Sequence, residues 1–286
     1  MSGGGHRPGL SVTGGGGWLA AMTVRTSPWP AGVPCWADLS VPDVETATRF
    51  YSDVLGWSFT TSDEQYGGYV IGSAGGAAAA GVGPQQSADQ TAAWTLYIAS
   101  DDADATAAAV LQAGGQILLP PGDVGPLGRM FVAADPTGAV FGVWQAGSHI
   151  GAGIVNEPGG MTWEDLRSTD PDVARAFYTR VFGYATEGLE MAGPDYTTFS
   201  STPGEAPLGG MGGMSGAAAG TPSHWLVYFG VADVEAAVTA ARKAGGQVLS
   251  ERFETPFGPM AALRDPAGAV FWITEPGATE QPDRSG

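Results

Sequence analysis

Polar and apolar side chains alternate along residues 34–41, PCWADLSV. Trp36, Asp38 and Ser40 fall on one face of an extended chain, and the small and aliphatic residues between them fall on the other. A period of two predicts a half-buried β-strand.

The pattern then changes to helical spacing. Asp43 is a good N-cap, and Gly56 is a good stop at the other end. Between them, six residues recur at the spacing of one buried helix face: Val44, Ala47, Phe50, Tyr51, Val54 and Leu55. Short strands are predicted near residues 57–61, 68–72 and 78–82.

The same order of elements returns further along the chain. A strand is predicted over 93–99, an Ala-rich helix over 102–113, and strands near 116–119, 129–134 and 139–145. Residues 135–138, DPTG, have the proline and glycine of a hairpin turn. Each unit therefore consists of a strand, a helix and three more strands.

Three landmarks show that this pair of units is itself duplicated. FYxxVxGx occurs at 50–57 and 177–184, AGGQ at 113–116 and 244–247, and DPxGAVF at 135–141 and 265–271. Their offsets are 127, 131 and 130 residues, in the same order. A repeat at a nearly constant offset indicates a duplicated domain.

These landmarks predict the organisation of the chain. We expect a disordered extension over 1–32, a first domain over 33–148, a Gly-rich linker over 149–159, a second domain over 160–276, and a tail over 277–286. In the second domain, Asp170 followed by a proline predicts a helix start.

The charge composition excludes some classes of binding partner. The chain has 12 Lys and Arg against 29 Asp and Glu, a net charge of −17, so we expect neither nucleic acid nor an anionic membrane as partner. Cys35 is the single cysteine, and no apolar run is long enough to span a bilayer. We expect a cytoplasmic protein, monomeric through its internal duplication or a weak homodimer.

The motifs PxWxDLxxxD at 34–43, FYxxVxGx and DPxGAVF together make the chain resemble the vicinal oxygen chelate superfamily. That superfamily includes glyoxalases, bleomycin resistance proteins and extradiol dioxygenases, and the tandem form resembles actinobacterial proteins labelled hydroxylase, glyoxalase-like or culture-filtrate antigen. The resemblance implies an α+β fold in which four βαβββ modules form two tandem glyoxalase-like domains with cup-shaped mixed sheets. Which modules pair to form each cup stays open, and a swapped pairing would bring Trp36 opposite His224.

Enzymes of this superfamily hold a divalent metal in the cup. The resemblance places the ligand positions on Trp36, Ala93 and Gly142 in the first domain, and on Trp163, His224 and Trp272 in the second. A metal site needs several His, Asp, Glu or Cys ligands at one point. We therefore expect no metal and no cofactor, with Asp38 or Asp165 as conceivable ligands from an unusual position.

The resemblance also implies which side chains line the cups, and aromatic walls with few polar groups suit a planar, mostly apolar small molecule. The alternative interpretations are that the tryptophans only fill the cup, and that Asp38 and Asp165 share a structural duty such as accepting backbone hydrogen bonds at a strand end. The candidate ligand-binding residues are Trp36, Asp38, Thr95, Tyr97, Trp144, Trp163, Arg167, Trp272, Met211 and Met214.

Two functions follow as hypotheses. The first is a metal-independent protein that binds a small aromatic or hydrophobic metabolite. The second is an enzyme of aldehyde or natural-product metabolism, glyoxalase-, hydroxylase- or dioxygenase-like, acting through the second domain. Its catalytic candidates are His224, Asp165 and Tyr228, which could move protons without a metal as a lyase, isomerase or oxidoreductase.

Overall fold

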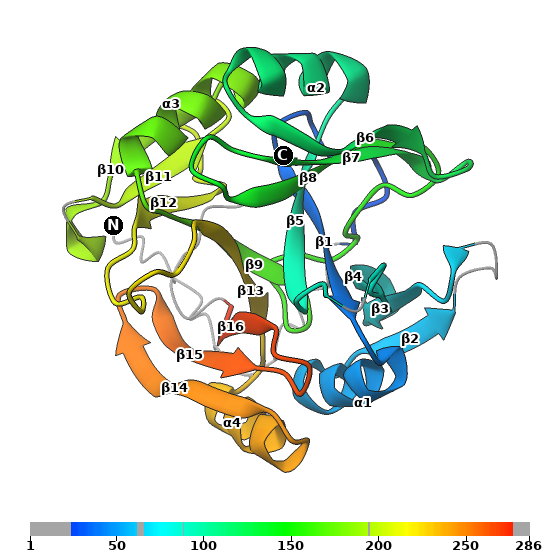
Figure 1. Cartoon of the computed structure of the whole chain (residues 1–286). Helices are drawn as coiled ribbons and strands as arrows, with labels where there is room; N and C mark the ends of the chain where they lie inside the picture. Colours follow the sequence, from blue (N-terminus) through cyan, green and yellow to red (C-terminus); the bar gives the residue numbers. More distant parts are fainter. Residues whose placement is uncertain (1–23, 62–65, 88, 194, 277–286) are drawn as a thin grey trace, which may run out of the picture.

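A computed structural model describes residues 24–61, 66–87, 89–193 and 195–276 (Figure 1). Its first domain contains two modules. The elements of the first module are β1 (Pro34–Val41), α1 (Val44–Leu55), β2 (Ser58–Thr61), β3 (Val70–Ala74) and β4 (Ala77–Pro84). Those of the second module are β5 (Ala93–Ala99), α2 (Ala103–Gln112), β6 (Gln116–Asp123), β7 (Gly128–Ala134) and β8 (Val140–Ala146).

The second domain repeats this order. The elements of its first module are β9 (Met161–Ser168), α3 (Pro171–Phe182), β10 (Ala185–Gly188), the short 3₁₀ helix η2 (Glu190–Ala192), β11 (Thr197–Ser200) and β12 (Gly209–Gly213). Those of its second module are β13 (His224–Gly230), α4 (Val234–Lys243), β14 (Gln247–Thr255), β15 (Gly258–Arg264) and β16 (Val270–Thr274). The predicted strand, helix and three strands are thus confirmed in all four modules.

Each domain forms one open, mixed sheet of eight strands. The strand orders are β2-β3-β4-β1-β5-β8-β7-β6 and β10-β11-β12-β9-β13-β16-β15-β14. The central pairs β1 with β5 and β9 with β13 are antiparallel, whereas β1 with β4 and β5 with β8 are parallel. Consecutive modules therefore pair within each half, which decides the question that the sequence left open and confirms the predicted fold class.

The predicted helix ends are confirmed in atomic detail. The Asp43 carboxylate accepts a hydrogen bond from the backbone N–H of Thr46 at 3.1 Å, and Gly56 closes α1 in the left-handed region at φ 70°. Asp170 caps α3 in the same way through the N–H of Val173, with Pro171 in the first turn. These local devices fix where each helix begins and ends.

The two domains pack back to back through their helices and central strands. Helix α1 of the first domain contacts α4 of the second, and α2 contacts α3 (Figure 1). The hydroxyl of Tyr51 donates across this boundary to the Asp265 carboxylate at 3.0 Å. The face of each sheet that points away from the boundary carries the alternate residues of the first strand, and the candidate site lies on this face.

The segment after β8 lies along the first domain. The N–H of Ala152 donates to the carbonyl of Cys35, and that of Gly153 donates to the carbonyl of Ala78, both at 2.7 Å. Ala152 and Ile154 are buried. The residues predicted as the linker between the domains are therefore packed against strands of the first domain over much of their length.

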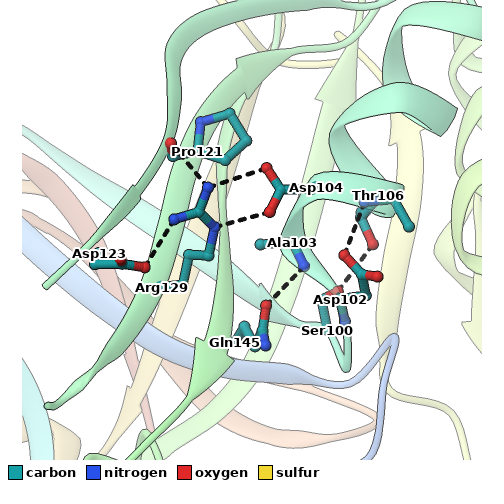
Figure 2. A network of polar contacts seen from close by, with 10 residues as sticks. Ser100, Asp102, Ala103, Asp104, Thr106, Pro121, Asp123, Arg129 and Gln145 are labelled. Carbon is teal, nitrogen blue, oxygen red and sulfur yellow. Dashed lines mark hydrogen bonds and ion pairs between the residues drawn. The ribbon is translucent and has the colours of Figure 1, made fainter.

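A polar network joins α2 to the β6–β7 hairpin (Figure 2). The Arg129 guanidinium donates two hydrogen bonds to the Asp104 carboxylate, at 2.9 and 3.0 Å, and a third to Asp123 at 2.7 Å. The Gln145 side chain accepts from the N–H of Ala103 at the start of α2. These contacts hold the hairpin in place at one edge of the first sheet, and Glu275 repeats the Gln145 contact at the start of α4.

Candidate functional site

The candidate site lies on the face of each sheet that carries the alternate residues of its first strand, and we call this face the cup. In the first cup, β1 presents Trp36, Asp38 and Ser40. Strand β5 lies beside it in register, with Tyr97 opposite Trp36 and Thr95 opposite Asp38. The predicted facing residues of β1 and β5 are therefore brought together.

A tyrosine that the sequence analysis did not single out completes the floor of the first cup. Tyr69 precedes β3 and lies flat across β4, and a Cβ at Gly81 would lie only 1.7 Å from its hydroxyl. A Cβ at Gly83 would lie 2.9 Å from its ring. Its hydroxyl accepts a hydrogen bond from the Trp36 indole N–H at 3.0 Å. The Tyr69 ring can occupy this position only because residues 81 and 83 of β4 are glycines without side chains.

Asp38 is the acidic centre of the first cup. Burial raises the pKa of its carboxyl to about 7, and a hydrogen bond with Tyr97 lowers the pKa less than burial raises it. Burial and the nearby Asp38 charge hold the pKa values of Tyr69 and Tyr97 well above the usual range for tyrosine. At neutral pH the site therefore combines neutral phenols with a carboxyl that can gain or lose a proton.

A cavity of about 170 Å³ opens beside Asp38. Tyr66 forms part of its wall and reaches towards the β6–β7 turn, since a Cβ at Gly125 would lie 3.2 Å from the Tyr66 hydroxyl. The residues lining the cavity are Asp38, Leu39, Ser40, Tyr66, Gly67, Tyr69, Gly83, Pro84 and Gln86. An open space next to a titratable group is the usual setting of a binding or reactive site.

His149, also not selected from the sequence, packs against the tryptophans of the first cup. Its ring lies edge-on to Trp36 at 4.6 Å and to Trp144 at 5.5 Å between centroids. The Trp144 indole donates to the backbone carbonyl of His149 at 2.9 Å. Burial lowers the pKa of the imidazole to about 4, so His149 is neutral at physiological pH.

The second cup has the same plan with one added cation. The Asp165 carboxylate accepts hydrogen bonds from the Tyr196 hydroxyl at 2.5 Å and the Trp163 indole at 3.0 Å. It also accepts from the Arg167 guanidinium and the Tyr228 hydroxyl, both at 3.1 Å. Four donors thus surround a carboxylate that is almost fully buried.

Tyr196 is the counterpart of Tyr69, at the same 127-residue offset as the FYxxVxGx motif. It lies over Gly210 and Gly212 of β12, as Tyr69 lies over Gly81 and Gly83. Applying the repeat offset to every tyrosine, rather than to the motifs alone, would have found both residues from the sequence.

The structure brings some of the predicted catalytic residues together but not all. Asp165 and Tyr228 are hydrogen-bonded to each other. His224 lies at the start of β13 opposite Arg167, and its ring Nδ1 is 2.8 Å from the backbone carbonyl of Pro222. The four side chains that donate hydrogen bonds to Asp165 do not include the His224 imidazole.

Three predicted ligand-binding residues of the second domain, Trp272, Met211 and Met214, do not all face the cup. Trp272 stacks on Tyr228 at 5.5 Å within the cup. Met211, fully buried in β12, pairs with Leu166 and so points to the core side, away from Asp165 and its partner Gly210. Met214 lies half-buried in the turn after β12. Of these three residues, Trp272 is the one within the cup.

The side chains present do not fit a divalent metal. The ligand positions that the resemblance implies hold indole rings, an alanine, a glycine and the peripheral His224, and the central carboxylate of the second cup is surrounded by N–H and O–H donors. Within the described residues, no group of three or more His, Cys, Asp or Glu side chains converges as a metal site. We therefore derive no chemistry through a metal.

Comparison with known families gives a match over both domains. Residues 35–143 and 160–273 each match the Glyoxalase/Bleomycin resistance protein/Dioxygenase superfamily. Across the described part of the chain, no helix is long and apolar enough to cross a membrane.

Two curated relatives cover nearly the whole chain. The putative glyoxylase CFP32 of Mycobacterium tuberculosis is 39% identical over 259 residues, which cover 88% of this chain and 98% of the relative. The anthracycline biosynthesis protein DnrV of Streptomyces peucetius is 38% identical over 259 residues, covering 85% and 93%.

Solved structures share the fold at low sequence identity. An Mn(II)-bound glyoxalase from Novosphingobium aromaticivorans superposes with a TM-score of 0.64 at 18% identity, covering 88% of this chain and 84% of its own. The 2,3-dioxygenase LapB from Pseudomonas sp. KL28 gives 0.61 at 16% identity, covering 93% and 96%. At this identity the likeness concerns the fold, while function depends on the site.

Proposed function

Because the chain belongs to the Glyoxalase/Bleomycin resistance protein/Dioxygenase superfamily, we propose that it is a metal-independent member that binds a small aromatic or hydrophobic metabolite in its first cup. One observation carries the proposal. Where the metalloenzymes would hold ligands, this chain has the Trp36 ring, Ala93 and Gly142, the last covered by the Tyr97 ring, and a cavity of about 170 Å³ opens beside Asp38. Such a site offers flat apolar surfaces and a few hydrogen-bonding groups, and no chelating set.

The chemistry of the lining favours a planar ligand. The Tyr66 and Tyr69 rings provide large rigid contact areas, and Ser40 and Gln86 supply polar contacts at the edge of the cavity. The relative named for anthracycline biosynthesis agrees with a polycyclic aromatic ligand class.

The first cup is the better binding site of the two. In the second cup the carboxylate already has four donors, among them the Arg167 guanidinium. A ligand there would have to displace an existing ion pair, which leaves a buried charge uncompensated. In the first cup no such displacement is needed.

Proton-transfer catalysis is a second candidate, and it too favours the first cup over the second. A carboxyl with a pKa near 7 beside an open cavity has the protonation behaviour of a general acid or base. An enzyme of this kind would lose turnover in Asp38→Asn at unchanged fold. A binding protein would show no turnover in the wild type with aldehyde or enolisable aromatic substrates.

Metal independence is tested by elemental analysis of the purified protein and by thermal unfolding with added Mn(II). We expect well under one divalent metal per chain and no change in Tm, because a ligand stabilises a protein only if it binds the folded state. One tightly bound metal per chain, or a clear rise in Tm with Mn(II), would overturn this part of the proposal.

Ligand binding is tested by tryptophan fluorescence and thermal shift with planar aromatic compounds from phenol to anthraquinones. We expect at least one class to raise Tm and to quench the wild-type fluorescence, since Trp36 and Trp144 line the cup. Ser40→Phe, which fills the cavity, should abolish both effects, whereas Ser215→Phe on an exposed turn should keep them. Binding that survives Ser40→Phe would place the ligand elsewhere.

A further inference from the structure

The duplicated chain contains an internal comparison between its two cups. Both cups have an aspartate at the same position of the first strand, a tryptophan two residues before it, and a tyrosine lying across two glycines of the neighbouring strand. They differ two residues after the aspartate, where the first cup has Ser40 and the second has Arg167. Around the aspartate, the tryptophan and the tyrosine that both cups share, the second cup therefore has a cation where the first has a serine.

The surroundings of Arg167 show which groups in the second cup contact a cation. Its guanidinium lies 3.1 Å from the Asp165 carboxylate and 5.7 Å from the centre of the Tyr196 ring. A Cβ at Gly212 would lie 3.5 Å from its Nη1 atom. The cation thus sits between a carboxylate, an aromatic face and a glycine backbone, a combination that suits charge pairing and a cation–π contact.

The same place in the first cup is open. The counterparts of those three groups are Asp38, Tyr69 and Gly83, and all three line the cavity of about 170 Å³. Ser40 lines it too, with a side chain too short to fill it. The cavity therefore occupies the position that the Arg167 guanidinium takes in the second cup.

Among the described residues, no basic side chain pairs with the carboxylate of the first cup. The charge neighbours of Asp38 do not include a basic side chain, and its pKa is set by burial and by Tyr97. None of the ion pairs among the described residues involves Asp38. Residues 62–65 and 88, which adjoin the cavity segment in the sequence and lie outside the described ranges, contain no Lys or Arg.

We propose that the first cup binds the cationic group of its ligand, an amine or amidine on a small aromatic or hydrophobic body, in the place that Arg167 fills in the second cup. This inference rests on the proposed function, because it takes the first cup as the ligand site. The ligand cation pairs with the Asp38 carboxylate and lies against the Tyr69 ring, and its apolar part contacts the aromatic wall. The net charge of −17 favours the approach of such a ligand over that of an anion.

Two probes of nearly identical shape test the inference. Benzamidinium carries a permanent cation at neutral pH, and benzamide is its uncharged analogue. By calorimetry on the full chain at pH 8, we expect benzamidinium to bind one site at least about tenfold more tightly than benzamide. Asp38→Asn, which keeps the size of the side chain, should remove that preference.

Exchanging Ser40 and its counterpart Arg167 provides the matched variants. Ser40→Arg supplies the cation from the protein and should weaken benzamidinium binding at least about tenfold. Arg167→Ser should open the second cup and raise the stoichiometry from one benzamidinium to two. Should Ser40→Arg fail to fold, Asp38→Asn and Arg167→Ser still test the inference.

The outcomes separate this inference from the proposed function. Benzamide binding as tightly as benzamidinium would overturn the inference and leave the proposed binding function standing. Failure of both probes to bind at millimolar concentration, with a planar aromatic compound still bound in the cup, would likewise overturn the inference alone. Absence of every ligand from the cup would overturn both, and an Arg167→Ser variant with an unchanged single site would contradict the equivalence of the two cups.

Discussion

At the scale of single residues, Asp38 and Asp165 show how the charge of one neighbouring side chain changes the chemistry of two copies of a site. Both carboxyls lie among tyrosine and tryptophan side chains, but Asp165 has the Arg167 guanidinium at 3.1 Å, whereas no cation of the described residues pairs with Asp38. A buried carboxylate without a cation is costly to ionise. The pKa of Asp38 is therefore raised to about 7, so that its carboxyl is only partly ionised at neutral pH.

The raised pKa of Asp38 predicts how the free energy of unfolding changes with pH. The Asp38 pKa is higher in the folded chain than in the unfolded one, so its contribution to stability is fully present below the unfolded pKa and is lost as pH rises through about 7. Asp38→Asn removes the ionisation. Relative to the wild type, its free energy of unfolding should rise by about 2 kcal/mol between pH 5 and pH 8, after allowing for solvent screening.

Urea unfolding of both proteins across this pH range measures the difference. Thr95→Val is the control, because it alters the neighbouring cup position without removing a titratable group. A difference between Asp38→Asn and the wild type that does not change with pH would contradict the raised pKa.

At the scale of elements, β4 and β12 have glycines at the positions that the Tyr69 and Tyr196 rings cover. Taken by itself, the Gly-rich sequence of residues 208–214 suits an edge strand near a cavity. In the structure β12 is an inner strand between β11 and β9, and its glycines receive the Tyr196 ring. A backbone without side chains lets a flat ring cover the sheet, and this forms the floor of each cup.

Gly81→Ala tests this role. Its methyl group would lie 1.7 Å from the Tyr69 hydroxyl, so the ring must move off β4 and lose its bond to Trp36. We expect a loss of about 1–3 kcal/mol in the free energy of unfolding, as for other overpacked sites. Ligand binding in the first cup should weaken as well.

Gly188→Ala is the matched control for this change. Gly188 also lies in a strand, β10, but nothing lies within 4 Å of a Cβ placed there. Its stability should stay within about 0.5 kcal/mol of the wild type. A similar loss in both variants would mean that strand propensity, and not the tyrosine, requires the glycine.

At the scale of the whole molecule, the FYxxVxGx helices join the two domains. Tyr51 accepts a hydrogen bond from Trp94 in its own domain at 3.2 Å and donates one to Asp265 in the other at 3.0 Å. Phe50, its neighbour, contacts Phe271 across the same boundary. The aromatic pair of the motif therefore belongs to the interface between the copies.

A double-mutant cycle with Tyr51→Phe and Asp265→Asn tests this coupling. Each single change leaves a buried polar group without its partner and should cost about 1–3 kcal/mol of unfolding free energy. The double variant should lose less than the sum, with a coupling of at least about 0.5 kcal/mol. Additive losses would show that the two side chains act independently.

The sequence by itself determined the repeat, the module order and the helix caps, because these depend on local spacing and on residues such as Asp43, Gly56 and Asp170. The resemblance to the superfamily implied the metal-ligand positions, and residues 36, 93, 142, 163 and 272 at those positions are not metal-ligating types. Alternation along β1 correctly grouped Trp36, Asp38 and Ser40, since a strand has a fixed period of two.

Only the tertiary structure decided which groups meet. The pairing of modules, the rings of Tyr69 and Tyr196 over distant glycines, and the approach of His149 to Trp36 join residues whose separation in sequence carries no periodic pattern. The same holds for the difference between the cups. The period of two places Arg167 and Asp165 on one face of β9, but that the guanidinium pairs with the carboxylate, and that its counterpart Ser40 leaves a cavity, follow from side-chain packing in three dimensions.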